Sequence, residues 1–307
     1  MSNFSDICSY TFYFLLNVMT YSIMMSLNDN FFKDFPIYYH FLLFSMSIIA
    51  YILLIITKNN PGEIINNKYS EIRKILSNDI VINIPESIEN NEFKENKISL
   101  IDCGKCTFCN NEVLPLRSHH CSRCKKCIKS YDHHCGMIGG CIGENNHFKF
   151  ILFLFFQSLA LFIGIFGLLE TLQNLIIRKK KRKPVTIYFL IFVLFFYGIF
   201  TLVLFLFHIY LVMTNQSTFE IYHPEKCDYL RKFTEEKKKI FKERNIFIDY
   251  SYTFHPFDMG IKENIKFVIR KFLNQKEKID WEEIYYKNLY SNKIPFNFCE
   301  NEYWSCF

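Results

Sequence analysis

The stretch that decides the fold starts with His119-His120-Cys121-Ser122-Arg123-Cys124-Lys125-Lys126-Cys127 and runs through Ser130-Tyr131-Asp132-His133-His134-Cys135 to Cys141. Cysteines two residues apart with histidines between them are typical of zinc sites. Together with the preceding Cys-x2-Cys pair, the ligands divide into two tetrahedral sets: Cys106, Cys109, His120 and Cys127, and Cys121, Cys124, His134 and Cys141. Eight ligands make two closed sites, so the expected zinc ions are structural.

Three neighbouring residues, Asp132, His133 and Cys135, remain outside the two sets. A thiolate is a nucleophile, an imidazole can take the proton of a thiol, and a carboxylate on the other ring nitrogen fixes the tautomer. These are the residue types of a nucleophile, its base and the group that orients the base. We expect the two metal sites to force the backbone turn that brings them together. The alternative is that Cys135 is a further zinc ligand or an inert thiol, although the ligand count closes without it.

This stretch resembles the cysteine-rich domain of the DHHC family of protein S-acyltransferases. The resemblance rests on Asp132-His133-His134-Cys135 inside the pattern Cys106-x2-Cys109, Pro115-x-Arg117-Ser118-His119-His120-Cys121-x2-Cys124-x2-Cys127 and Cys141-Ile142-Gly143-x2-Asn146. It implies a palmitoyltransferase that uses palmitoyl-CoA or another long-chain acyl-CoA, acts on protein cysteines by a ping-pong route, and carries the acyl group as a thioester on Cys135.

The sequence departs from the family pattern at two places. Gly136-Met137 replaces the usual Pro-Trp, and Gly139-Gly140 replaces two asparagines. Glycine loosens the backbone and methionine packs less rigidly than tryptophan, which bears on the rate more than on the identity of the reaction. The gap from Cys109 to His120 is one residue longer than expected, so Cys103 is an alternative to Cys106 in the register of the first zinc set.

Composition argues for a membrane protein. Half of the 307 residues are hydrophobic, 35 are phenylalanine, and the net charge is +6. Four apolar runs reach the ~20 residues that a bilayer span needs, over 8–27, 37–57, 148–169 and 185–213, and all but 148–169, which contains Lys149, are free of Asp, Glu, Lys and Arg. The predicted fold class is therefore mainly α, a polytopic membrane protein with four transmembrane helices and a cytosolic cysteine-rich domain that holds two zinc ions.

The expected organisation has five parts. They are transmembrane helices 1 and 2 (1–57), a cytosolic linker with an Asn-Pro-Gly motif (58–99), the zinc domain (100–147), transmembrane helices 3 and 4 (148–213) and a cytosolic tail (214–307). Thiolate ligands must stay reduced, so the zinc domain and both termini are expected in the cytosol. The basic cluster 178–183 disagrees with that orientation by the positive-inside rule. No cleavable signal peptide is recognised, and the resemblance implies an endomembrane location, in Golgi or endoplasmic reticulum, with plasma membrane as an alternative.

Four shorter segments carry further expectations. Asn60-Pro61-Gly62 is a plain turn by sequence alone and, beside the resemblance, a motif that follows the second span. An amphipathic helix is predicted over 64–80, on the membrane surface or packed on the protein. Gln216–Glu220 is typical of a polar helix end, and its resemblance to a family motif implies positioning roles for Thr218 and Glu220. In His255–Asn264, proline and glycine predict a turn that enters a helix, and the resemblance implies a structural role for Asn264.

Basic residues near the nucleophile are candidates for binding the phosphates of CoA: Arg123, Lys125, Lys126, Lys129 and Lys149. The alternative is that they only solvate a small zinc domain. The phenylalanine-rich spans would hold the acyl chain, and the resemblance implies that the position limiting chain length lies near Ala160. Expected partners are the bilayer, acyl-CoA and membrane-proximal protein substrates, but no nucleic acid. The alternative functions are a catalytically weak zinc-domain scaffold and, less favoured, a channel or transporter, for which His208 is an isolated ionisable group.

Overall fold

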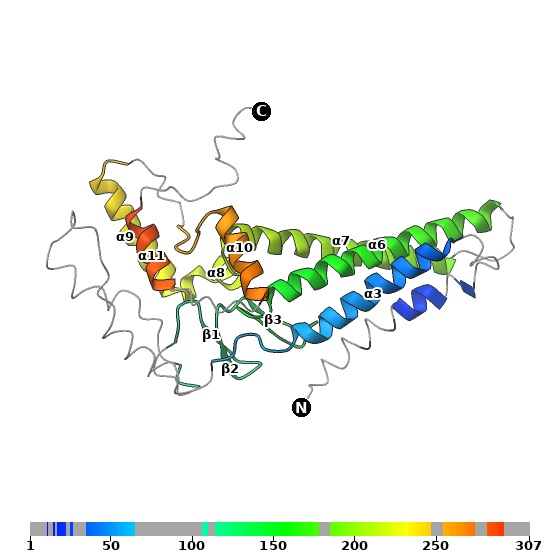
Figure 1. The fold of residues 1–307 in the computed structure, drawn as a ribbon, viewed down its shortest axis with the longest axis horizontal. Helices are drawn as coiled ribbons and strands as arrows, with labels where there is room; N and C mark the ends of the chain where they lie inside the picture. The colour runs from blue at the N-terminus through cyan, green and yellow to red at the C-terminus, as the bar shows by residue number, and fades with distance from the viewer. Residues whose placement is uncertain are drawn as a thin grey trace. The chain divides into compact units, whose positions relative to one another are not determined.

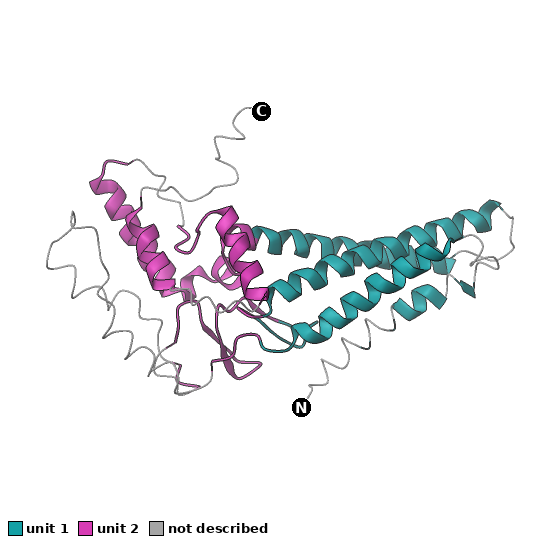
Figure 2. Cartoon of the chain, in the orientation of Figure 1, with its two compact units in different colours: residues 1–60, 135–142, 146–210 teal, residues 61–134, 143–145, 211–307 magenta. Residues whose placement is uncertain are grey.

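The computed structural model describes residues 35–64, 106–109, 114–177, 185–246, 254–273 and 281–291, with scattered residues between 11 and 26. The chain forms two compact units (Figure 2). Unit 1 comprises residues 1–60, 135–142 and 146–210, and unit 2 comprises residues 61–134, 143–145 and 211–307. Each unit is described by itself below.

Unit 1 consists mainly of long apolar helices (Figure 1). Among the described residues, three helices are long and apolar enough to cross a membrane: α3 (Ile37–Thr57), α6 (His147–Ile177) and α7 (Val185–Thr214). They match the second, third and fourth predicted spans. The first predicted span, 8–27, lies largely outside the described residues, so four spans stay a prediction.

Helix α6 is longer than predicted. The predicted span ends at Leu169, but the helix continues past Glu170 to Ile177. Glutamate has a high helix propensity, so a single charge ends an apolar run without ending the helix. The end of the apolar run therefore marks where the side chains become more polar, and the backbone stays helical beyond it.

Two apolar clusters hold unit 1 together. The first joins Phe35, Tyr39 and Leu43 to the later part of α6 and the start of α7. The second joins Ala50, Leu53 and Leu54 of α3 to the first turns of α6 and to Ile138 and Ile142. The short segment 135–142 is therefore packed on the ends of two spans.

Several of the predicted zinc ligands lie on the strands of two small sheets. Strands β1 (His119–Cys121) and β2 (Lys126–Ile128) pair antiparallel in unit 2. Strands β3 (His133–Cys135) and β4 (Gly140–Ile142) form the other two-stranded sheet, whose connecting turn belongs to unit 1.

The Asn-Pro-Gly segment does more than make the plain turn that sequence alone favoured. Glu63 forms a β-bridge with Ile128, the N–H of Ile64 donates to the carbonyl of Cys127 at 2.9 Å, and the carbonyl of Gly62 accepts from the N–H of Lys129 at 2.9 Å. Gly62 has a φ of +97°, which a residue with a Cβ rarely adopts. The segment thus adds an edge to the β1–β2 hairpin.

The C-terminal part of unit 2 is helical. It contains α8 (Thr218–Tyr222), the 3₁₀ turn η2 (Pro224–Lys226), α9 (Asp228–Glu243), α10 (Ile261–Phe272) and α11 (Trp281–Tyr290). Aromatic residues form its core, among them Phe233, Phe241, Phe254, Phe257 and Tyr285. The helix expected after Gly260 is confirmed as α10. Most of the predicted amphipathic helix 64–80, the basic cluster 178–183 and the cysteines Cys299 and Cys306 lie outside the described residues.

Candidate active site and metal centres

Strand β1 explains why two neighbouring residues serve different ligand sets. Successive side chains of a strand point to opposite faces, so His120 and Cys121 face opposite ways. His120 lies directly across from Cys127, and Cys121 lies across from Lys126. The backbone therefore presents one pair of predicted ligands on one face and a member of the other set on the opposite face.

The first predicted set comes together within unit 2. Ligand atoms of Cys106, Cys109, His120 and Cys127 all lie within 4.8 Å of one another. The Nδ1 atom of His120 is 3.1 Å from the Sγ of Cys109 and 3.6 Å from the Sγ of Cys127. Zinc with bonds of ~2.3 Å to sulfur and ~2.0 Å to nitrogen would place such atoms about 3.5 Å apart. Three thiols and one imidazole at these distances fit a structural zinc ion.

The pKa of the Cys106 thiol is lowered from its ordinary value. Burial alone would raise it, but the backbone N–H groups of Cys109 and Phe108 and the side chain of Cys127 hydrogen-bond to the sulfur and more than offset burial. A sulfur that accepts hydrogen bonds is more easily deprotonated, as a metal ligand must be. Cys103, the alternative for this register, lies outside the described residues.

Three members of the second set also lie together in unit 2. The Nδ1 atom of His134 is 3.6 Å from the Sγ of Cys121 and 3.3 Å from the Sγ of Cys124, and the N–H of Cys124 donates to the Sγ of Cys121 at 3.4 Å. These separations again suit ligands of a common zinc ion. Cys141, the predicted fourth ligand, is a buried residue of unit 1.

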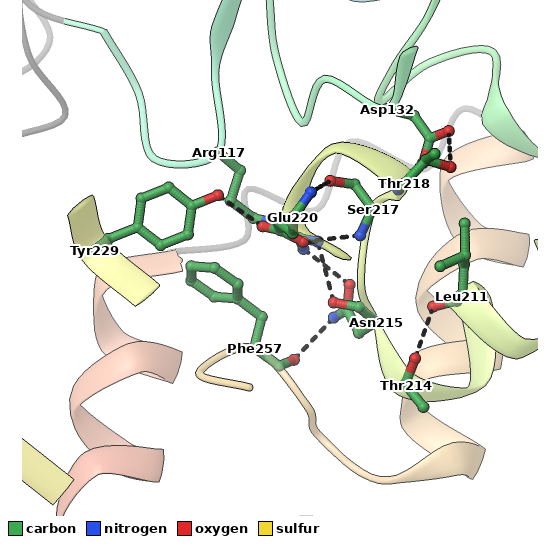
Figure 3. Close-up of polar contacts among 10 residues, drawn as sticks. All are labelled: Arg117, Asp132, Leu211, Thr214, Asn215, Ser217, Thr218, Glu220, Tyr229 and Phe257. Atoms are coloured by element: carbon green, nitrogen blue, oxygen red, sulfur yellow. Dashed lines mark hydrogen bonds and ion pairs between the residues drawn. The ribbon is translucent and has the colours of Figure 1, made fainter. Parts of the chain in front are cut away.

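The predicted base and its orienting carboxylate are in contact. The Nδ1 atom of His133 lies 2.6 Å from the Oδ2 atom of Asp132, which is 2% exposed. Thr218 fixes the carboxylate from the other side: its N–H donates to Oδ1 at 2.8 Å and its hydroxyl donates to Oδ2 at 2.7 Å (Figure 3). With Nδ1 bonded to the carboxylate, the Nε2 atom of His133 is the ring atom suited to accept a proton.

The predicted nucleophile, Cys135, belongs to unit 1. It is half-buried, ends β3, and its carbonyl accepts from the N–H of Gly139 at 2.9 Å. Its side chain packs on the apolar cluster of α3 and α6, beside Met137 and the buried Ile138. Gly139 has a φ of +66°, a conformation that glycine and asparagine tolerate best, so glycine in place of asparagine keeps the turn.

Segment 216–220 contacts Asp132, one of the predicted catalytic residues. Ser217 caps α8: its hydroxyl accepts from the N–H of Glu220 at 3.2 Å, and its own N–H donates to Glu220 at 2.8 Å. Residue Thr218 then follows as the first helical residue, where its N–H and hydroxyl reach Asp132. Segment 216–220 is therefore both the polar helix end that the sequence predicted and the segment that contacts Asp132, as the resemblance implied for Thr218.

Sequence reasoning missed a buried network around Arg117 (Figure 3). The guanidinium donates to both carboxylate oxygens of Glu220, at 2.8 and 2.7 Å, and to the side chain and carbonyl of Asn215, at 2.9 and 3.0 Å. Its face covers the rings of Phe257 and Trp281 at 4.6 and 4.9 Å. Burial alone would lower the pKa of Arg117, yet Glu220 raises it above its ordinary value, so the guanidinium stays charged.

Two further contacts complete this network. The hydroxyl of Tyr229 donates to Glu220 at 2.8 Å, and burial followed by the charge of Glu220 raises the pKa of Tyr229, which keeps it a donor. The side chain of Asn215 donates to the carbonyl of Phe257 at 2.9 Å. The partners of Arg117 lie about a hundred positions away in the sequence, with no local signal to reveal them.

The candidate phosphate-binding residues surround the β1–β2 hairpin. Arg123, Lys125 and Lys126 are exposed and Lys129 is half-buried. Lys126 pairs with Glu63 at 2.7 Å in an exposed ion pair. The structure therefore leaves these cations accessible and assigns a ligand to none of them.

The region that holds these residues is similar to known proteins. The family model for DHHC palmitoyltransferase matches residues 102–225. A putative ZDHHC-type palmitoyltransferase 7 of Dictyostelium discoideum is 34% identical over 218 residues, 66% of this chain and 42% of the relative. Palmitoyltransferase ZDHHC3 of Homo sapiens is 30% identical over 183 residues, 57% of this chain and 56% of the relative.

The chain is also similar to a plant protein. Probable protein S-acyltransferase 12 of Arabidopsis thaliana is 34% identical over 145 residues, 46% of this chain and 49% of the relative. The chain spans about half the length of these curated relatives. Over residues 102–225, this chain is therefore similar to the DHHC palmitoyltransferase family.

Proposed function

We propose that the protein is an S-acyltransferase that moves a long-chain acyl group, such as palmitoyl, from acyl-CoA to cysteines of other proteins through a thioester on Cys135. The contact of His133 with a carboxylate that Thr218 fixes carries the proposal. The carboxylate of Asp132 is buried and accepts two hydrogen bonds from Thr218, so it can hold His133 in one tautomer, which suits the imidazole to proton transfer.

The alternation of β3 supports the choice of Cys135 as nucleophile. His134 faces the thiols of the second metal set, and residues two apart in a strand point to the same face. His133 and Cys135 therefore share the face opposite to His134. This explains how three consecutive residues serve two purposes, and it leaves Cys135 outside the ligand sets.

Zinc, held by the two predicted sets, would supply rigidity. Sites made of four protein ligands keep no open position for substrate, so the metal would act by fixing β1, β2 and β3. The proposed ligands are Cys106, Cys109, His120 and Cys127 for one ion and Cys121, Cys124, His134 and Cys141 for the other.

The proposed reaction balances as two thioester exchanges. His133 takes the proton of the Cys135 thiol, the thiolate attacks the acyl carbonyl of acyl-CoA, the bond to the CoA sulfur breaks, and the proton passes from His133 to CoA. In the second half, His133 takes the proton of an acceptor cysteine, whose sulfur displaces Cys135. One thioester replaces another, so the enzyme contributes positioning and proton transfer.

Substrate positions follow from the surroundings of these residues. Cys135 packs on an apolar cluster of α3 and α6, and each buried methylene of an acyl chain contributes about 0.8 kcal/mol. The exposed Arg123, Lys125 and Lys126, with Lys129, are the proposed contacts of the CoA phosphates. We place the zinc region on the cytosolic side of an endomembrane, because reduced thiols are needed there.

The test is autoacylation of the purified full chain with a labelled palmitoyl-CoA analogue. Wild type should take up hydroxylamine-labile label, and Cys135→Ser should take up none. Thr218→Val removes the hydroxyl donor to Asp132 and should slow labelling roughly 10-fold, as expected for a lost hydrogen bond of about 1.5 kcal/mol to a charged group.

Zinc content serves as the control for folding. All three proteins should carry the same amount of zinc, since none of the substitutions touches a predicted ligand. Wild type that binds zinc but takes up no label would refute the enzyme and leave the zinc-domain scaffold. Gly136, in place of proline, is the sequence feature that favours that second candidate.

A further inference from the structure

Helix α8, which carries Thr218, is too short to hold its own position. It spans five residues, whereas isolated helices shorter than about 12 residues are marginal in water. Its position therefore depends on contacts with the rest of unit 2. Because Thr218 donates two hydrogen bonds to Asp132, whatever fixes α8 also fixes the carboxylate that contacts His133.

Glu220 ties α8 to the interior of unit 2 (Figure 3). Its carboxylate accepts hydrogen bonds from the guanidinium of Arg117 at 2.8 and 2.7 Å and from the hydroxyl of Tyr229 at 2.8 Å. Glu220 and Arg117 are 5 and 7% exposed. Since Glu220 and Thr218 belong to the same helical turn, the place of the guanidinium determines where the hydroxyl of Thr218 lies.

Two aromatic rings lie against this guanidinium. Its central carbon is 4.6 Å from the ring centroid of Phe257 and 4.9 Å from that of Trp281. The two rings contact each other edge-on with centroids 5.4 Å apart, and Trp281 makes a second edge-on contact with Phe267 at 5.3 Å. Tryptophan attracts a cation more strongly than the other aromatic residues, and the attraction is larger where water is excluded, so Trp281 contributes to holding the buried Arg117.

Trp281 comes from a part of the chain that the family model does not match. It is the first residue of α11, whereas the matched residues are 102–225. Arg117, Asp132, Thr218 and Glu220 all lie within that range, and all five residues belong to unit 2. A helix outside the matched residues is therefore in contact with the network that fixes the predicted catalytic carboxylate.

We propose that Trp281 is a positioning residue for acyl transfer. Its ring holds the guanidinium of Arg117, and the guanidinium holds the first turn of α8. In that position Thr218 fixes Asp132, the carboxylate that orients the proposed base. The inference rests on the proposed function, and it goes further by making α11 a determinant of the rate of that reaction.

The alternative is that Trp281 only fills the aromatic core of unit 2. Tyr286 provides the matched control, because it is another half-buried ring of α11 that packs against this core. It is not one of the pair of rings over the guanidinium of Arg117. Packing alone would make the two positions equivalent, whereas positioning gives Trp281 an effect on the rate that Tyr286 does not have.

Single-turnover autoacylation of the purified full chain with a labelled palmitoyl-CoA analogue tests the proposal. Trp281→Leu should lower the rate at saturating donor about 5-fold, as expected for the loss of a buried cation–π contact, and should leave the donor concentration at half-maximal rate unchanged. Trp281→Phe keeps a ring over the guanidinium and should recover most of the rate. Tyr286→Leu should label at the wild-type rate.

A double variant tests the route through α8. Thr218→Val already lacks the hydroxyl donor to Asp132, so adding Trp281→Leu to it should slow labelling less than about 2-fold further. Independent effects would multiply, so the full loss in that background would overturn the proposal. Equal rates for Trp281→Leu and Tyr286→Leu would overturn it as well.

Zinc content and the midpoint of thermal unfolding report whether each variant is folded. Should Trp281→Leu lose zinc, Trp281→Met takes its place, because the flexible methionine side chain adapts to the same space without a ring. Wild type that takes up no label refutes the proposed function itself. A labelled wild type with an unaffected, ring-less variant at Trp281 refutes this inference alone.

Discussion

The two units of this protein are stabilised by different kinds of contact. In unit 1, mainly leucine, isoleucine and phenylalanine side chains of α3, α6 and α7 form two apolar clusters. In unit 2, one guanidinium makes four hydrogen bonds, to Glu220 and Asn215. Apolar packing accepts many side chains of similar volume, whereas a buried network accepts only the residue that completes it. Substitutions of equal size should therefore have unequal effects in the two units.

Loss of a metal ligand should have the largest effect. Cys127→Ser removes a buried thiol from the first set, so the protein should lose one zinc ion and the fold around β1 and β2. Structural zinc contributes apparent free energies of about 10–16 kcal/mol in small zinc domains. Elemental analysis of zinc per chain, with limited proteolysis of the folded protein, measures both losses.

The matched control for that variant is Cys227→Ser. Burial raises the pKa of Cys227 to about 11, so this residue is a neutral thiol outside both ligand sets. It should keep full zinc content. Full zinc content in Cys127→Ser as well would refute the first ligand set.

Breaking the network should come next. Arg117→Met leaves Glu220 and Asn215 buried without the hydrogen bonds that the guanidinium donates, and it should lower the free energy of unfolding by about 3–5 kcal/mol. Arg231→Met, which removes an exposed pair with Asp228, should cost no more than about 0.5 kcal/mol. Thermal unfolding in detergent compares the two, and similar shifts would contradict the role we give to Arg117.

A pair of glycines sharpens the comparison at a smaller scale. A Cβ at Gly143 would lie 2.6 Å from both Ile128 and the carbonyl of Pro61, so Gly143→Ala should destabilise the protein by about 1–3 kcal/mol. A Cβ at Gly136 meets nothing within 4 Å, so Gly136→Ala should raise stability by about 0.4–1 kcal/mol. The same melting experiment decides, and equal signs for the two variants would refute this account.

A volume-conserving substitution in the apolar core of unit 1 should also have a small effect. Leu168→Met keeps the volume of a fully buried side chain on α6 and should cost less than about 1.5 kcal/mol. The equally conservative Arg117→Lys should cost more, because lysine lacks the planar fork that reaches both Glu220 and Asn215. If Leu168→Met proved the more damaging of the two, the contrast between the units would be wrong.

Local signals allowed much of this structure to be predicted. Uncharged runs gave α3 and α7 to within one residue, and the spacing of cysteines and histidines gave the first metal set. The contact of Asp132 with His133 was also predictable, because adjacent residues need no long-range information. Each of these features is encoded within a few consecutive residues.

Long-range features could not be predicted in the same way. Arg117 finds Asn215 and Glu220 about a hundred residues later, and nothing near Arg117 names them. By sequence, the charged stretch before Arg244 is typical of a solvated helix face. Most of α9 fits that description, but Lys237 is buried and donates to the carbonyls of Asn288, Leu289 and Ser291, where it closes the end of α11. A charged residue such as Lys237 can therefore be buried when backbone carbonyls far away in the sequence accept its hydrogen bonds.

The two-residue period of β1 has a consequence for how this chain can vary over evolutionary time. Removing one residue between positions 119 and 121 would reverse which side chain faces which predicted ligand set, so a single deletion would disrupt both sets at once. Insertions and deletions should therefore be excluded from this hairpin, and changes of length should accumulate in the connections outside it.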